Sequence, residues 1–98
     1  MKTIKGQATC SDSGDIPSGS VVLVYVCKGA ETVGRQTFQN LTQFPIQFNV
    51  QLSNLSDQDH DLIVNVENGE NLLFTNGKTK IDQSQSLENL NIEVKRIV

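Results

Sequence analysis

Alternation of hydrophobic and polar side chains, with a period of two, is the feature that most constrains what this chain can fold into. The clearest run is 46–52, and the pattern recurs at 61–67 and near the end of the chain. A period of two places neighbouring side chains on opposite faces of a β-strand, so each run is expected to bury one face. No long stretch has the i, i+3, i+4, i+7 spacing of an amphipathic helix, and 83–89 has room for one helical turn at most.

Turn residues separate these runs. Asn68-Gly69 stands between two hydrophobic segments, which is the strongest short hairpin signal in the chain and predicts a type I′ turn. Asn76-Gly77 predicts a further turn, and Pro45 precedes a strand, where its missing N–H costs no ladder hydrogen bond. The expected strands are about 2–10, 20–28, 33–39, 46–52, 61–67, 70–76 and 88–97. They predict an all-β fold, a single small domain over residues 1–98 that forms a seven- to eight-stranded sandwich or a partly closed barrel.

The expected strand 20–28 is hydrophobic on both faces, unlike a strand that is buried on one side only. Its core-facing residues would be Val22, Val24 and Val26. Two interpretations of the opposite face are open: a second layer or the closure of a barrel covers it, or it meets a partner. A large, rigid and amphipathic tyrosine suits an interface. The candidate partner-binding residues are Val21, Leu23, Tyr25 and Cys27.

The two cysteines are too few for a disulfide scaffold. If 2–10 and 20–28 pair as an antiparallel hairpin, Cys10 and Cys27 lie on the order of 20 Å apart along the ladder. A disulfide needs Cα atoms within about 7 Å of one another. This geometry predicts two free thiols.

No catalytic or metal-binding constellation is visible. The single histidine, His60, lies between Asp59 and Asp61 at a strand start, and we expect a surface or rim histidine rather than a general base. Asp57, Asp59 and Asp61 have the odd-numbered spacing of a calcium loop but lack its glycine and terminal glutamate. We therefore expect no catalytic residues, no metal, no cofactor and no enzymatic activity.

Charge and composition bear on the class of partner. The net charge is −3 with 19% charged residues, which argues against a nucleic-acid partner because such proteins carry a basic surface. Asparagine and glutamine occur nine times each, giving a polar surface of low charge that serves solubility or faces a carbohydrate or peptide. No hydrophobic run approaches the roughly 18 residues of a membrane span.

Three segments, in order, resemble the YscW-type pilotins, the lipoprotein chaperones of type III secretion, and their YbaY-like relatives. The segments are IPSGSVVLVYV at 16–26, FPIQFNV at 44–50 and GENLLFTN at 69–76. The resemblance implies a compact β-sandwich with a non-enzymatic role: pilotins bind a secretin subunit and help it reach the outer membrane. It implies a periplasmic or secreted location, although no signal peptide opens the sequence and Cys10 follows no lipobox, which leaves a cytosolic location open.

The expected function is therefore that of a non-enzymatic, protein-binding or chaperone-like module with a protein or peptide partner. Two alternatives stay open. One is a self-assembling structural domain that forms a homo-oligomer through the hydrophobic face of strand 20–28. The other is a small-ligand binder.

Overall fold

Nine β-strands in two sheets form the fold, as seen in a computed structural model that describes residues 2–11, 15–52, 60–81 and 88–97. None of these residues is helical, so the expected all-β class is confirmed. The strands are β1 (Lys2–Thr9), β2 (Val21–Lys28), β3 (Glu31–Gln39), β4 (Ile46–Leu52), β5 (His60–Asn68), β6 (Asn71–Thr75), β7 (Thr79–Ile81), β8 (Leu90–Glu93) and β9 (Lys95–Arg96).

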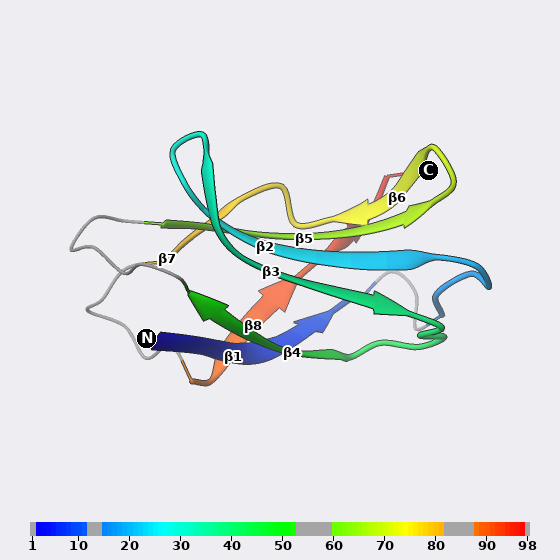
Figure 1. Cartoon of the computed structure of the whole chain (residues 1–98). Coiled ribbons are helices and arrows are strands. Elements are labelled where there is room, and N and C mark those ends of the chain that lie inside the picture. The colour runs from blue at the N-terminus through cyan, green and yellow to red at the C-terminus, as the bar shows by residue number, and fades with distance from the viewer. Residues whose placement is uncertain (1, 12–14, 53–59, 82–87, 98) are drawn as a thin grey trace.

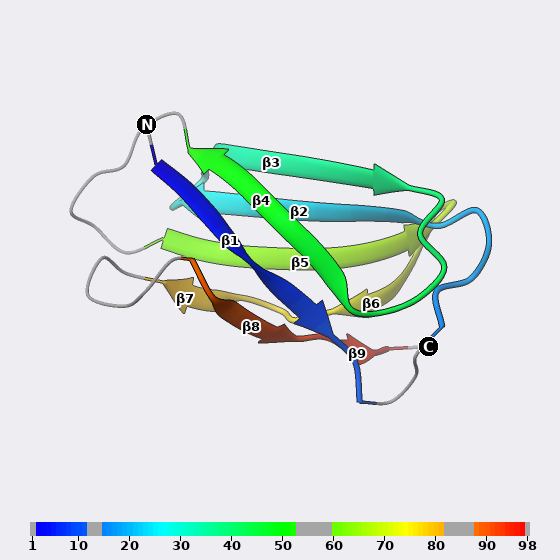
Figure 2. The same ribbon diagram turned by 90° about the horizontal axis from the view of Figure 1, so that it is seen from below.

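The large sheet has the strand order β3-β2-β5-β6-β9, and β7 pairs with β5 beyond the end of β6 (Figures 1 and 2). The small sheet has the order β4-β1-β8, in which β1 runs antiparallel to β4 and parallel to β8. The small sheet covers one face of the large sheet, as the two views show. The fold is therefore a β-sandwich.

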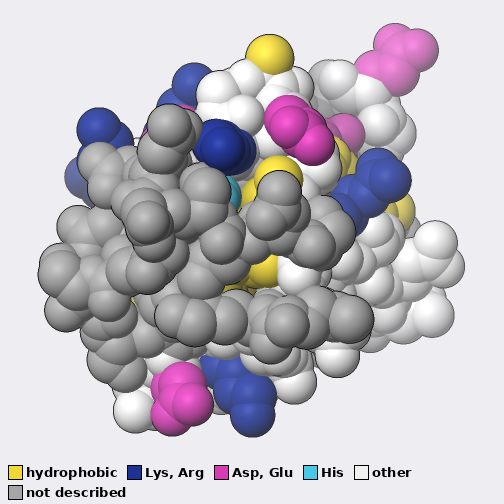
Figure 3. Space-filling view, turned by 60° about the vertical axis from the view of Figure 1, so that its left-hand side comes forward, with side chains coloured by type: hydrophobic (Ala, Val, Ile, Leu, Met, Phe, Trp, Pro, Cys, Tyr) yellow, Lys and Arg dark blue, Asp and Glu magenta, His cyan; other side chains and the backbone are white. Residues whose placement is uncertain are grey.

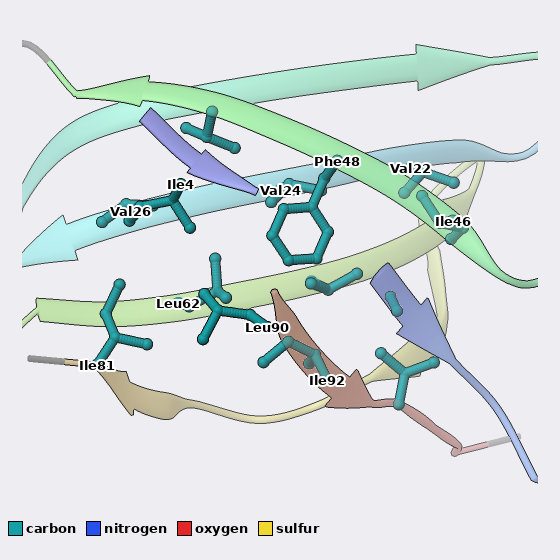
Figure 4. Close-up of a cluster of buried hydrophobic side chains, with 14 of the residues drawn as sticks. Ile4, Val22, Val24, Val26, Ile46, Phe48, Leu62, Ile81, Leu90 and Ile92 are labelled. Atoms are coloured by element: carbon teal, nitrogen blue, oxygen red, sulfur yellow. The ribbon is translucent and has the colours of Figure 1, made fainter. Parts of the chain in front are cut away.

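The core lies between the two sheets and is built by the alternation seen in the sequence. Along β4, every second side chain from Ile46 to Leu52 is buried, and β5 buries Leu62, Val64 and Val66 in the same way. The Phe48 ring lies among these aliphatic side chains (Figure 4). It has room because Gly6 is its partner on β1: a Cβ there would lie 2.9 Å from the ring's Cζ.

The two sheets meet differently at their two sides. At one side the chain itself crosses from sheet to sheet, because β8 pairs with β1, β9 pairs with β6, and the buried Val94 lies between them. At the other side β3 and β4 approach through side chains, where the Gln36 Oε1 accepts a hydrogen bond of 2.8 Å from the Asn49 backbone N–H. Among the described strands no ladder joins β3 to β4, so the two sheets form a sandwich and not a closed barrel.

The expected pairing of the first two strands is wrong. β1 pairs with β4 over seven residue pairs and with β8 on its other edge, so neither edge is left for β2. The segment that follows Asp15 pairs instead with the chain around Gln43, and the Ile16 N–H donates to the Thr42 carbonyl. The connection 10–20 thus carries the chain from the small sheet to the large one.

Besides shifts of one residue at several strand ends, three larger features differ from the expectation. The run 88–97 is divided between the two sheets at Val94, β7 was not expected, and β3 begins at Glu31 because a bulge opposite Val26 shifts its register. The expected helical turn at 83–89 lies mostly outside the described residues.

The Asn68-Gly69 hairpin is present, but its turn is of another type. The pair Asn68–Asn71 closes the turn, and of the two central residues only Gly69 has a positive φ, 62°. This is the pattern of a type II′ turn, whereas type I′ needs positive φ at both positions. Asn68 instead uses its side-chain amide to donate to the Ser18 carbonyl at 3.1 Å, which fixes the entry to β2.

Asn76 joins β6 and β7 to β5 by imitating a peptide group. Its side-chain Oδ1 accepts a hydrogen bond from the Val64 N–H at 2.8 Å, and its Nδ2 donates to the Leu62 carbonyl at 3.0 Å. The same Nδ2 lies 2.9 Å from the Thr79 hydroxyl. The ladder along β5 therefore continues across the break between β6 and β7.

Asn76→Asp replaces the donating amide by a carboxylate that can only accept, so the buried Leu62 carbonyl loses its partner. We expect the free energy of unfolding to fall by about 2 kcal/mol, measured by urea denaturation. Asn71→Asp, at an exposed position in β6, is the matched control and should change the free energy of unfolding only slightly. Equal effects of the two changes would contradict this role of Asn76.

Gly6→Ala tests the close approach inside the small sheet. The added Cβ would meet the Leu90 carbonyl oxygen and lie 2.8 Å from the Leu90 Cβ, and neither can move without shifting β8. We expect a loss of about 3 kcal/mol in the same denaturation experiment. Gly29→Ala, at a turn with open space around it and a φ of 61°, is the control and should cost about 1 kcal/mol. A smaller loss at Gly6 than at Gly29 would show that the sheet adjusts freely.

Candidate functional site

The four candidate binding residues lie side by side on the outer face of β2. Val22, Val24 and Val26 point into the core and are at most 1% exposed, which leaves the alternate residues on the opposite face of the sheet. Val21, Leu23, Tyr25 and Cys27 are each half-buried there. The expected division of β2 into an inner and an outer hydrophobic row is confirmed, while the role of the outer row in binding stays a prediction.

Two more hydrophobic side chains extend this row. Ile63 on β5 stands directly opposite Tyr25, and Leu72 on β6 stands opposite Glu67, which in turn faces Val21. Both are half-buried. We name the set of Val21, Leu23, Tyr25, Cys27, Ile63 and Leu72 the outer patch.

No described strand covers the outer patch. Every strand belongs either to the large sheet itself or to the small sheet, which packs on the other face (Figure 1). The interpretation that a second layer covers the outer row of β2 therefore finds no support in the described part of the chain. The row is half-buried because side chains on the neighbouring strands stand beside it.

Polar and charged side chains border the outer patch on both sides. On β3, Arg35 lies opposite Tyr25 and Thr37 lies opposite Leu23. On β5, Asn65 lies opposite Leu23, and its Oδ1 accepts a hydrogen bond of 2.6 Å from the Thr75 hydroxyl. The hydrophobic surface is therefore a band that follows β2, with a small extension onto β5 and β6.

Charge differs between the two borders. On the β5 border Glu67 lies opposite Val21, and Asp61 lies between Cys27 of β2 and Lys80 of β7, whereas the β3 border carries Arg35. Elsewhere on the described surface, acidic and basic side chains are interspersed, as one end of the molecule shows (Figure 3). Side chains of both signs therefore border the band, with Glu67 on the β5 side and Arg35 on the β3 side.

The position of β2 limits how the outer patch can bind. β2 is hydrogen-bonded to β3 on one edge and to β5 on the other, so its backbone groups are already paired. Strand addition needs an unpaired edge. A partner on the outer patch must therefore contact side chains.

Both cysteines are free, as expected, although the premise of that prediction is wrong. β1 and β2 belong to different sheets instead of forming a hairpin. Cys10 packs at the edge of the core, and the Cys27 sulfur lies on the outer patch, 3.8 Å from the Thr32 hydroxyl.

His60 is buried, so the expectation of a surface or rim histidine is wrong. It is 3% exposed at the start of β5, opposite Ile81 on β7, and its Nε2 has no hydrogen-bond partner in the part of the chain that the structure describes. Neighbouring carboxylates do not form a metal site with it among the described residues. Asp57 and Asp59, two of the three residues with calcium-loop spacing, lie outside the described residues.

His60→Leu removes a buried nitrogen that has no hydrogen-bond partner among residues 2–11, 15–52, 60–81 and 88–97, and it keeps a side chain of similar size. We expect the melting temperature to rise by about 5 °C, equivalent to about 1 kcal/mol, in a thermal unfolding experiment followed by circular dichroism. His60→Asn, which retains a buried polar group, should lower the melting temperature. If His60→Leu lowers the melting temperature as much as His60→Asn does, the imidazole nitrogen has a hydrogen-bond partner in solution.

Comparison with known proteins supports the fold. The chain is similar to an alternative pilotin from the type II secretion system of Vibrio cholerae, with a TM-score of 0.80 and 15% sequence identity over 99% of this chain and 97% of that one. The fold is thus pilotin-like. At this identity the similarity does not extend to the YscW-type or YbaY-like groups in particular, and comparison with family models and with curated sequences finds no match.

No helix within the described residues is long and hydrophobic enough to cross a membrane.

The outer patch contains residues that sequence reasoning did not single out as binding candidates. Ile63 follows from the alternation of the run 61–67, but its place beside Tyr25 depends on a pairing of strands 38 residues apart. Leu72 reaches the outer face because a bulge between Val66 and Glu67 shifts the register of β6. No local feature of the sequence predicts that bulge.

Proposed function

We propose that the chain is a non-enzymatic, pilotin-like binding module that holds a segment of a secretin subunit on the outer patch. The main supporting observation is the outer patch itself, a hydrophobic band that follows the interior strand β2 of the large sheet and that no described strand covers. The pilotin-like fold and the sequence resemblance to secretion pilotins support the choice of partner class.

The dimensions of the outer patch favour an amphipathic helix as the bound segment. From Val21 to Cys27 there are six strand steps, about 20 Å at strand rise. A helix of about 13 residues has the same length, and its width of about 10 Å matches two neighbouring strands. Its hydrophobic stripe would cover β2 while its polar flanks meet the borders on β3 and β5.

The borders would also orient the helix. Basic side chains on one flank of the helix would lie near Asp61 and Glu67, and an acidic side chain on the other flank would lie near Arg35. Such border charges contribute more to orientation and association rate than to affinity. Helix docking of this kind also leaves the backbone ladder of the large sheet intact.

Leu23→Asp and Tyr25→Asp, made singly, place a carboxylate in the middle of the outer patch. We expect each to weaken binding of a secretin subunit from the source organism by about 30-fold or more, as for a central interface residue, in isothermal titration calorimetry. The control is Gln51→Asp, an exposed position on β4 of the small sheet, which should leave affinity unchanged. Full affinity in both patch variants would rule out the outer patch as the binding surface.

Cys27 offers a second readout in the unaltered chain. A bound partner should slow the reaction of Cys27 with a maleimide at least several-fold, while Cys10, at the edge of the core, serves as the internal control. Protection of Cys27 that depends on the chain's own concentration, without a partner, would instead indicate a homo-oligomer through the same patch. Equal reactivity with and without the secretin subunit would contradict the proposal.

A further inference from the structure

The outer face of the small sheet has a hollow that is independent of the outer patch. It has a volume of about 510 Å³, is open to solvent and lies over the middle of β1. The polar side chains that line it come from all three strands of the sheet and from Glu88 and Asn89, directly before β8. We name the set of Lys5, Gln7, Gln47, Asn49, Asn89 and Asn91 the amide hollow.

A row of side-chain amides crosses the sheet at its centre. The Gln47 Nε2 donates to the Gln7 Oε1 at 3.3 Å, and the Gln7 Nε2 donates to the Asn91 Oδ1 at 2.9 Å. All three residues share one register across β4, β1 and β8. The hydrogen bonds run in one direction, so Gln47 keeps a carbonyl oxygen at one end and Asn91 keeps an amide nitrogen at the other.

The two ends of this row suit a ligand that both accepts and donates hydrogen bonds. They are separated by two strand spacings, about 10 Å. Lys5 and Asn49 form a second row beside the first, and their side chains make no hydrogen bond among the described residues. A hydroxyl group donates and accepts at once, so a chain of hydroxyl-bearing rings can satisfy both rows.

The surroundings exclude other classes of ligand. The charged residues lining the hollow are one lysine, Lys5, and one glutamate, Glu88. Their charges balance, so the hollow has no net electrostatic attraction for a polyanion or a polycation. Its two hydrophobic members, Phe48 and Leu90, are 3% and 8% exposed and give a peptide side chain little to pack on. β1 is hydrogen-bonded on both edges, which prevents a peptide from pairing with it as a strand.

We propose that the amide hollow is a binding site for a neutral oligosaccharide of at least two sugar units. The ligand lies across β4, β1 and β8 and hydrogen-bonds to the amide rows through its hydroxyl groups. Without an aromatic platform in the hollow, a few neutral hydrogen bonds supply the affinity, which gives an expected Kd of about 1 mM.

The test is a titration of the isotope-labelled full chain by nuclear magnetic resonance, with maltotetraose, cellotetraose and chitotetraose as separate probes. We expect at least one probe to shift the side-chain NH₂ signals of Gln7, Gln47 and Asn91 with a Kd of about 1 mM. Gln47→Ala, at an exposed position, should weaken that binding by about fivefold. Gln51→Ala, on the same face of β4 but outside the hollow, is the matched control and should change nothing.

Three outcomes would overturn the proposal. One is the absence of shifts with all three probes at about 20 mM, which is some twentyfold above the expected Kd. Another is shifts confined to the outer patch on the opposite sheet. The last is tighter binding of a sulfated tetrasaccharide, which would assign the surface to anions through Lys5. The first and last of these outcomes leave the proposal for the outer patch untouched, because that site lies on the other sheet and is tested separately by titration with the secretin subunit.

Discussion

The pairing of β2 on both of its edges is the constraint on which the rest of the structure depends. β3 and β5 occupy these edges, and the inner valines of β2 are buried against the small sheet. The strand therefore has three of its four sides committed to the fold. Any contact between β2 and a binding partner must therefore use its outer face, which is hydrophobic.

Close approach of the two sheets is what makes the inner side so well filled. Between the sheets, a Cβ on Gly34 of β3 would lie 2.8 Å from side chains of both Val50 and Leu52 of β4; within the small sheet, Gly6 leaves space for the Phe48 ring. At the opposite side the chain crosses between the sheets at Val94. A sandwich held in this way keeps its inner volume for packing, so binding surfaces must lie on the outside of the sheets.

Much of the fold could be predicted from the sequence because its signals are local. Alternation within 46–52 and 61–67 identifies strands and their buried faces, and a glycine marks each hairpin turn. Partner strands could not be predicted in the same way. β1 pairs with β4 and β8 across 38 or more residues of sequence, and the fit of Gly6 beside Phe48 across the sheet accompanies that pairing.

Side-chain roles were harder to predict than strands. The sequence predicts Asn76 to be a turn residue, yet its side-chain amide completes the ladder on β5. It does so because the break between β6 and β7 leaves peptide groups on β5 that need hydrogen-bond partners. The sequence predicts His60 to be a rim residue between two carboxylates, but β7 pairs with the start of β5, and His60 is buried there. For the candidate site, the four outer residues of β2 could be named from alternation alone, while Ile63 and Leu72 required the register.

The two outer faces of the sandwich differ in chemistry, because one is mainly hydrophobic and the other is polar. The large sheet presents hydrophobic side chains bordered by opposite charges, and the small sheet presents amides joined in a directed row. A hydrophobic stripe and a polar hydroxylated ligand have little affinity for each other's surface, because burying unpaired polar groups is costly. The core separates the two faces, so neither occupant would obstruct the other. A domain of 98 residues can thus offer two independent binding surfaces, one on the outer face of each sheet.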